Sequence, residues 1–407
     1  MAYYFIFPEI DTTIYSHPDR KTMNTGADEL LELVKEPGST DQSHHPSRIL
    51  IKFKNEEITS TISLIGDTNF TSSLSSSVNL QLSLAEAKNI VSTHIINAYA
   101  ISQSWDEGTG KYLNTPTASN GASWIYRDNS TIETKWETES FTTGTTGSIS
   151  SPLVGGIGTF IIGSTFIVGS SPTVLTQGGG TWYTGSNFYG TQQFLKGDDL
   201  DTNINVKEII HKFSASLNAG KTFPEGIENY GFLIKTIDNV ETNASSSFGE
   251  LQYFSSDTHT IYPPKLCFKW DDSIQLSNQQ NIAKQKGELS VLLYGNKKEY
   301  NQNEIAKFKI HVRDKYPTRE FSETSNYLNV GYFTTGSFYS VRDAHTEREI
   351  IPFDDTFTKL SSDVDGMYFN LYMDGLQPER YYRILFKHIN NDGTTVYDDK
   401  YFFKIVR

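Results

Sequence analysis

Cysteine is nearly absent from this chain, since Cys267 is the only one among 407 residues. One cysteine excludes a disulfide framework and any CxxC-type zinc or redox site. Basic residues are also outnumbered: 35 Lys and Arg stand against 48 Asp and Glu, which gives a formal net charge of −13. A dedicated nucleic-acid binder needs a basic face to displace counterions from phosphates. We therefore expect no direct contact with nucleic acid.

Long apolar segments are scarce as well. The most apolar one, Leu153–Val168, is 16 residues long and contains four glycines. A membrane helix needs about 20 predominantly apolar residues. Because the segment is β-branched and lies between Pro152 and Pro172, it predicts hairpin strands or a packed loop and no membrane span. The first residues carry no basic region and are interrupted by Pro8, which predicts synthesis in a cytoplasm without a signal peptide.

Aromatic residues are abundant, with 23 Tyr and 25 Phe, and such residues favour strands. Short runs in which apolar and polar residues alternate predict half-buried strands. The clearest are 47–54, 78–84, 94–101 and 230–237. A single segment, 207–217, has apolar residues at helical spacing, with Asn205 placed to cap it. The chain is therefore predicted to be mainly β, with one short helix.

Two domains are expected. The first, 1–273, is predicted to be a jelly-roll-like β-sandwich with a Gly-rich insertion at about 138–200. A linker rich in Gln and Asn follows at 274–287. The last part, 288–407, has several short strands and predicts an immunoglobulin- or fibronectin-like β-sandwich. Its segment Asp374–Tyr382 resembles the turn and tyrosine that precede a late strand in fibronectin type III domains.

An ordered series of short motifs runs through the first domain. These motifs are Asp11–Tyr15, Asn24–Gly26, Ser47–Phe53, Ala98–Ile101, Trp105–Gly110, Gly121–Trp124, Gly178–Trp182, Asp201–Ile204, Asn229–Phe232, Phe254–Asp257 and a strand from Pro264 onward. Their succession resembles the DNRLRE-type β-sandwich domains of secreted bacterial and archaeal surface proteins. The resemblance covers roughly residues 3–273 and implies a β-sandwich fold.

The start of the chain carries a second resemblance. The segments Phe5–Tyr15, Asn24–Leu33 and Ser47–Phe53 are similar to structural proteins of T4-like tailed phages that infect marine cyanobacteria and related bacteria. This resemblance implies a virion component of the tail, neck or baseplate region. It also implies oligomers, with other virion proteins and copies of the chain itself as partners.

Catalytic motifs are missing from the sequence. It contains no HExxH, GxSxG or Walker A pattern, and Gly155–Gly158 is only a fragment of a Gly-rich loop. His44-His45 is read as part of a solvated loop, with metal binding as the alternative. Asp198–Asp201 is read as turn and capping residues, with Ca²⁺ binding as the alternative. We therefore predict no enzyme, and assign no catalytic residue, no cofactor and no metal ligand.

The tryptophans allow three interpretations: core packing, a protein interface, or a platform for stacking sugars. Core packing is the ordinary role for Trp105 and Trp124, while Trp182 follows three glycines and is expected at a contact surface. Four residues are proposed as contact residues from the sequence: Trp182, Tyr183, Phe160 and Phe166.

The sequence thus predicts a non-enzymatic structural protein of a virion that acts through subunit contacts. The alternative is a carbohydrate-binding or host-receptor adsorption protein that recognises a host surface glycan. A polysaccharide hydrolase would need two carboxylates at catalytic separation, and the sequence singles out no such pair.

Overall fold

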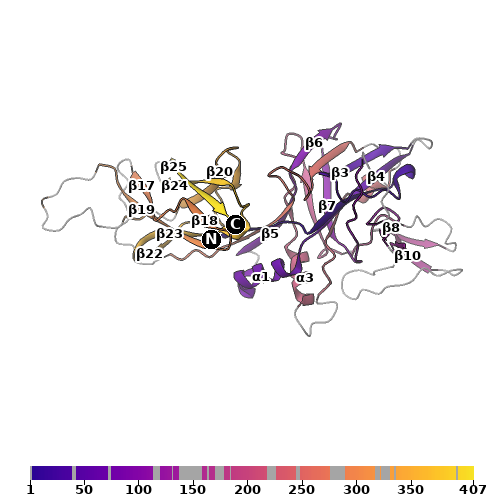
Figure 1. Ribbon diagram of the computed structural model, residues 1–407, viewed down its shortest axis with the longest axis horizontal. Coiled ribbons are helices and arrows are strands. Elements are labelled where there is room, and N and C mark those ends of the chain that lie inside the picture. The colour runs from indigo at the N-terminus through magenta and orange to yellow at the C-terminus, as the bar shows by residue number, and fades with distance from the viewer. Residues whose placement is uncertain are drawn as a thin grey trace. The chain divides into compact units, whose positions relative to one another are not determined.

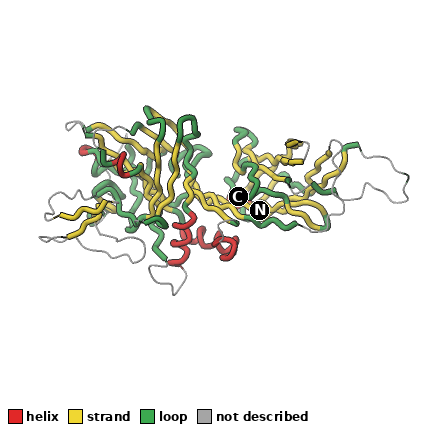
Figure 2. Tube along the Cα trace, turned by 180° about the vertical axis from the view of Figure 1, so that it is seen from behind, coloured by secondary structure: helices red, strands yellow, loops and turns green. Residues whose placement is uncertain are grey.

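The computed structural model describes most of the chain, and the structural statements below concern that part. The described ranges are 2–38, 43–71, 75–112, 120–130, 132–136, 158–162, 165–169, 178–183, 185–217, 226–243, 248–275, 289–316, 321, 331–333, 336–390 and 393–407. Strands dominate these residues, and Figure 2 shows them in yellow with the few helices in red. The prediction of a mainly β protein is confirmed.

The chain divides into two compact units. The larger unit comprises Ile6–Leu64 and Val78–Cys267, and the C-terminal unit comprises Met1–Phe5, Ile65–Ser77 and Phe268–Arg407. The predicted domain limits of 1–273 and 288–407 stay a prediction. The units differ from them because two N-terminal segments and residues 268–273 group with the C-terminal residues. The predicted linker, 274–287, lies largely outside the described residues.

An eight-stranded sheet forms the body of the larger unit (Figure 1). Its order is β12 (Tyr189–Phe194), β7 (His94–Ala100), β14 (Phe232–Thr236), β4 (His44–Lys52), β3 (Leu30–Pro37), β15 (Glu250–Phe254) and β6 (Leu84–Lys88), with β2 (Ile10–Tyr15) also paired to β4. Neighbouring strands in this sheet run antiparallel. Three of the predicted strands, 47–54, 94–101 and 230–237, correspond to β4, β7 and β14.

A second sheet has the order β1 (Ala2–Ile6), β16 (Lys265–Trp270), β5 (Ser76–Gln81) and β13 (Ile204–Asn205). The alternation predicted for 78–84 is confirmed in part, because Val78, Leu80 and Leu82 are buried. Two hairpins stand apart from these sheets: β8 (Tyr126–Asp128) with β9 (Thr134–Lys135), and β10 (Gly158–Ile162) with β11 (Thr165–Gly169).

The predicted helix is confirmed as α3, Lys207–Leu217. The Asn205 side chain accepts a hydrogen bond from the Lys207 amide at 3.0 Å, as expected of a residue that caps the first turn. The expectation of a single helix is wrong, because α1 (Asn55–Ile65), α2 (Asp67–Thr71) and α4 (Asp238–Glu241) are also present. In the described residues, no helix is both long and apolar enough to span a membrane.

The C-terminal unit is a β-sandwich of two sheets. One has the order β17 (Leu289–Tyr294), β19 (Ile305–Asp314), β23 (Gly366–Tyr372) and β22 (Ser361–Asp363). The other has the order β18 (Glu299–Asn301), β25 (Gly393–Val406), β24 (Tyr381–Asn390), β20 (Ser337–Asp343) and β21 (Glu349–Ile351). Aromatic rings fill the space between them: Phe369 of β23 stacks on Tyr339 of β20, with ring centroids 4.2 Å apart.

The tyrosine that the sequence places near the start of a late strand, Tyr382, lies in β24 and makes a specific contact. Tyr382 is buried, and its hydroxyl donates a 2.8 Å hydrogen bond to the Gln377 carbonyl, five residues earlier. Such a bond fixes the chain where it enters the strand, as it does in immunoglobulin-like sandwiches. The similarity to fibronectin type III domains itself stays a prediction.

Candidate interaction surface

Trp182, the residue most expected at a contact surface, lies in the core. Its exposed fraction is 4%, and it packs in a cluster of the larger unit with Trp105, Trp124 and Trp136. The expectation of an exposed ring is therefore wrong for Trp182. Core packing, the ordinary role for Trp105 and Trp124, holds for all four tryptophans of this cluster.

The three glycines before Trp182 explain its burial. Gly178, Gly179 and Gly180 all have positive φ, between 86° and 119°. A Cβ on Gly179 would lie 2.6 Å from Arg48 Nη1 and 2.7 Å from Trp124 Cζ2. Only a chain without side chains at this point can pass so close over Arg48 and Trp124. The glycines serve close packing, whereas the sequence analysis expected Trp182, which follows them, at a contact surface.

Arg48 of β4 is the centre of this cluster. Its guanidinium carbon lies 4.6 Å from the ring centroid of Trp124 and 4.8 Å from that of Trp182. Arginine is well suited to this position because its planar guanidinium is weakly hydrated and stacks on aromatic faces. Its Nη1 also donates to the Gly179 carbonyl. Arg48 was not identified from the sequence. The feature that could have indicated it is a cation within an otherwise apolar strand.

Glu241 of α4 neutralises Arg48. Nε and Nη2 of Arg48 donate to Oε1 and Oε2 of Glu241 at 2.7 and 3.0 Å. Lys235 of β14 donates to Glu241 as well, and to Asp238 at 2.5 Å. Burial alone would raise the pKa of Glu241, but the charges of Arg48 and Lys235 outweigh it and lower the pKa to about 2. The three side chains form a buried, charge-paired network that holds α4 against β4 and β14.

Tyr183, the second proposed contact residue, is half-buried. Its ring stacks on Phe188 with centroids 5.4 Å apart, and its amide donates to the Ala100 carbonyl at 2.9 Å. Burial, with a contribution from the charge of Glu228, raises the pKa of Tyr183 to about 12. The side chain is thus held by its own unit and leaves only part of its surface for a partner.

Phe160 and Phe166, the remaining proposed contact residues, lie on the hairpin β10–β11. Phe160 pairs with Ile167, and Phe166 pairs with Ile161. Their side chains are outside what the structure describes. The backbone confirms the hairpin predicted for the apolar segment. It also makes this hairpin a separate two-stranded sheet in the described part, so each strand has one outer edge without a neighbouring strand.

Several motifs of the ordered series meet around Asn24. Its Nδ2 donates to the carbonyls of Glu107 and Ala122, both at 2.7 Å. Its Oδ1 accepts from the amides of Gly26 and Gly110 at 3.2 and 2.8 Å. A fully bonded, buried amide of this kind fixes three loops in one arrangement. The motifs therefore have a structural role here.

A pair of carboxyl groups lies beside Asn24 and was not predicted. The Asp11 amide donates to Glu107 Oε1 at 3.0 Å, and Asp11 Oδ2 accepts from the Ser256 amide at 2.7 Å. Burial, followed by the charge of Glu107, raises the pKa of Asp11 to about 7. Burial and the charges of Asp257, Asp106 and Glu9 raise the pKa of Glu107 to about 7 as well. The pKa values of both carboxyl groups are thus raised into the neutral range, chiefly by burial.

The other candidate residues have local structural roles. Asp198 Oδ2 accepts from the Leu195 amide at 2.8 Å and Asp201 Oδ1 from the Leu84 amide at 2.7 Å, as expected for turn residues. His44 and His45 lie in β4, so the prediction of a solvated loop is wrong at these positions. They extend β4 by pairing with Pro37 and Glu36 of β3. In the described residues, no group of three or more potential ligands could hold a metal ion.

Comparisons with known proteins give no match: neither a protein-family model nor a curated protein is similar to this chain. The resemblances to DNRLRE-type domains and to phage structural proteins therefore stay predictions that depend on the residues alone.

Proposed function

We propose that the chain is a non-enzymatic structural component of a tailed-phage virion, in the tail, neck or baseplate region. It acts through contacts with other virion proteins and with copies of itself. The phage assignment depends on the resemblance of Phe5–Tyr15, Asn24–Leu33 and Ser47–Phe53 to such proteins.

The hairpin β10–β11 is the observation that carries the interaction role. Its strands pair with each other and with no third strand in the described part. A two-stranded sheet alone is marginally stable in water, and its free edges offer backbone donors and acceptors to a further strand. The sequence of both strands is apolar, and apolar surface left uncovered promotes aggregation. A strand from a neighbouring subunit would satisfy both requirements.

The carbohydrate-binding alternative loses its original basis. It required tryptophan faces open to solvent, whereas Trp105, Trp124, Trp136 and Trp182 are each at most 9% exposed. A sugar cannot stack on rings that are covered by their own unit. Any glycan contact has to come from another part of the chain.

Quantitative mass spectrometry of purified particles tests the proposal. A structural component should co-purify with the major particle proteins at a fixed ratio, and that ratio reflects the symmetry of its assembly. The particle-free supernatant and the cell fraction serve as comparisons. Recovery of the protein only in those fractions would reject the virion assignment.

A further inference from the structure

The outer face of the β17–β19–β23–β22 sheet carries a row of basic side chains. Along β19, Ala306, Phe308, Ile310 and Val312 are buried in the sandwich, so the alternate residues lie on the opposite face. Four of these are basic or imidazole side chains: Lys307, Lys309, His311 and Arg313. Such a row is unexpected in a chain with a net charge of −13.

The lysines of this row are already neutralised. Lys307 Nζ lies 2.9 Å from Asp363 Oδ2, and Lys309 Nζ lies 3.4 Å from Asp365 Oδ2. His311 and Arg313 differ, because the described residues provide no hydrogen-bond or ion-pair partner for either side chain. The uncompensated positive charge is therefore concentrated at the Arg313 end of the row.

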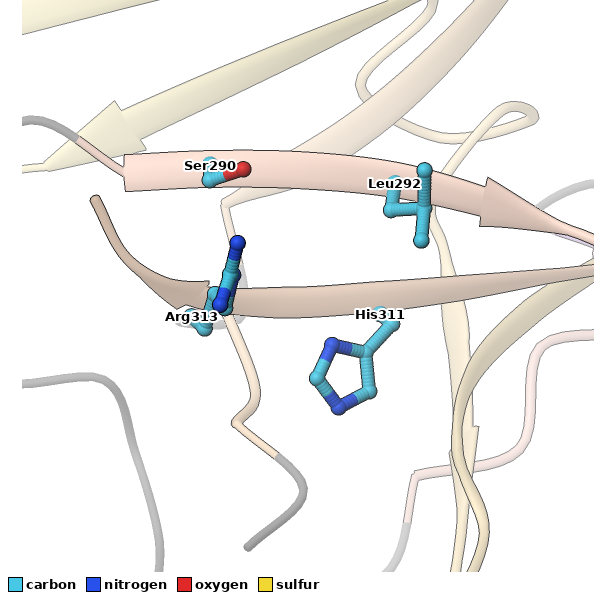
Figure 3. A pocket seen from close by; sticks show the side chains of 4 residues that line it. All are labelled: Ser290, Leu292, His311 and Arg313. Carbon is cyan, nitrogen blue, oxygen red and sulfur yellow. The ribbon is translucent and has the colours of Figure 1, made fainter. Parts of the chain in front are cut away.

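A pocket of about 260 Å³ lies at this end of the row. Its described lining comes from β17 and β19, whose register places Ser290 opposite Arg313 and Leu292 opposite His311. Figure 3 shows these four side chains on the two neighbouring strands. The pocket thus combines a hydroxyl, an imidazole and a guanidinium with one apolar side chain. Leu292 is 53% exposed, and Tyr294, two residues further along β17, is 68% exposed.

We propose that this pocket binds an acidic saccharide, with its carboxylate or phosphate group between Arg313 and His311. Arginine provides parallel N–H donors that match the two oxygens of such a group. Ser290 adds a hydroxyl donor, and Leu292 offers an apolar surface to the C–H face of the sugar ring. The volume of about 260 Å³ lies just below the range of about 300–1,000 Å³ that is typical of pockets for drug-sized ligands, so we expect a single sugar unit as the occupant.

A nucleic acid fits this surface less well. Its affinity depends on neutralising several successive phosphates, and two unpaired side chains cannot do this within a strongly acidic chain. An isolated oxyanion on an otherwise uncharged or sparsely charged polymer needs only one such pocket. The inference does not depend on the virion assignment, because the pocket belongs to a single chain.

Saturation-transfer NMR on the purified full-length chain provides the test, because it detects weak binding from the side of the ligand. Glucuronate and glucose 6-phosphate should receive saturation, and neutral glucose should receive little. Arg313→Ala should weaken binding of both acids by about tenfold or more, the loss expected for hydrogen bonds to a charged group. Leu292→Ser should weaken binding of the sugars and leave the unfolding transition unchanged.

Two further variants distinguish the pocket from general charge effects. Arg348→Ala removes the same charge from the loop between β20 and β21 and should leave binding unchanged. Arg313→Lys keeps the charge but loses the fork of donors, so it should bind less tightly than the wild type. The proposal is overturned if neither acid receives saturation, or if Arg313→Ala binds as well as Arg348→Ala. Competition by acetate or inorganic phosphate as strong as that by the acidic sugars would also overturn it.

Discussion

Arg48 and Glu241 form a bidentate ion pair in the interior of the larger unit, although 193 residues separate them in the sequence. Their side chains are 11% and 5% exposed. Taking two charges out of water is costly, and the cost is offset only when geometry is good and the remaining donors and acceptors are satisfied. The bond to Gly179, the two tryptophan faces and the contact with Lys235 provide this compensation.

Breaking this pair should destabilise the larger unit strongly. Glu241→Gln leaves the buried Arg48 without a counter-charge and leaves Lys235 with Asp238 alone, and we expect it to lower the free energy of unfolding by about 3–5 kcal/mol. Urea unfolding followed by tryptophan fluorescence measures this, since Trp124 and Trp182 contact Arg48. Glu86→Gln is the matched control, because Glu86 and its partner Lys88 are 52% and 49% exposed. It should cost at most about 1 kcal/mol. Equal effects of the two substitutions would contradict the role of the network.

The same pair predicts an acid-dependent loss of stability. The pKa of Glu241 is about 2 in the folded chain and close to the ordinary value for glutamate in the unfolded chain. Its contribution is therefore complete above about pH 4.5 and is lost as the pH falls towards 2. The difference in stability between the wild type and Glu241→Gln should shrink over this range. A difference that stays constant down to pH 2 would show that Glu241 is not held as a carboxylate.

Asp11 predicts the opposite dependence on pH. Its folded pKa of about 7 lies above the value of about 4 in the unfolded chain, so the protonated form stabilises the fold. This contribution is complete below about pH 4 and is lost as the pH rises through 7. Asp11→Asn stays neutral and keeps an acceptor for the Ser256 amide. We expect the melting temperature of the wild type to fall relative to this variant between pH 5 and 8.

Glu29→Gln serves as the control for Asp11, because the Glu29 side chain is 57% exposed. Its melting temperature should follow the wild type across the same range. Parallel curves for the wild type and Asp11→Asn would refute the assignment of a proton to Asp11 near neutral pH.

Period-two alternation made β4, β7 and β14 predictable, because a strand with one buried face has to alternate. The helix α1 was missed, since Asn55–Ile65 is rich in Thr, Ser and Ile, which have low helix propensity. Burial of its apolar face against the rest of the fold stabilises α1 despite this low propensity. Ile58, Ile62 and Ile65 recur at helical spacing and are each at most 6% exposed. Propensity alone cannot show that a partner surface will cover this face.

The contacts of the larger unit were less predictable than its strands. Asn24, Trp105–Gly110 and Gly121–Trp124 stood out in the sequence only as members of an ordered series, and the structure brings them together. The pairing of Arg48 with Glu241 had no signal in spacing, because it joins β4 to a short helix far along the chain. Likewise, three consecutive glycines are compatible with either a mobile loop or close backbone packing, and only the fold shows which of the two applies.

Tyr382 offers a test of the C-terminal unit with a control one residue away. Tyr382→Phe removes the hydroxyl that donates to the Gln377 carbonyl and leaves the buried ring in place. We expect a loss of about 1–2 kcal/mol in unfolding free energy, typical of a buried hydrogen bond. Tyr381→Phe changes a side chain that is 48% exposed and should cost much less. Similar losses for both variants would mean that the bond to Gln377 does not fix the start of β24.

The last prediction concerns the hairpin β10–β11. Deleting residues 150–175 should leave the folded monomer intact, because β10 and β11 pair with no strand of the larger sheets in the described part. It should prevent incorporation into particles if the free edges pair with a neighbouring subunit. Circular dichroism and thermal melting test the first expectation, and quantitative mass spectrometry of particles assembled with the variant tests the second.

A length-matched control separates the apolar strands from the mere presence of a loop. Replacing residues 158–169 with a Gly/Ser sequence of equal length keeps the connection but removes strand propensity and apolar surface. This variant should fail to enter particles as completely as the deletion. Normal incorporation of both variants would reject the hairpin as an interface. Normal incorporation of the Gly/Ser variant alone would show that only the length of the connection matters, and the edge-pairing argument would then be wrong.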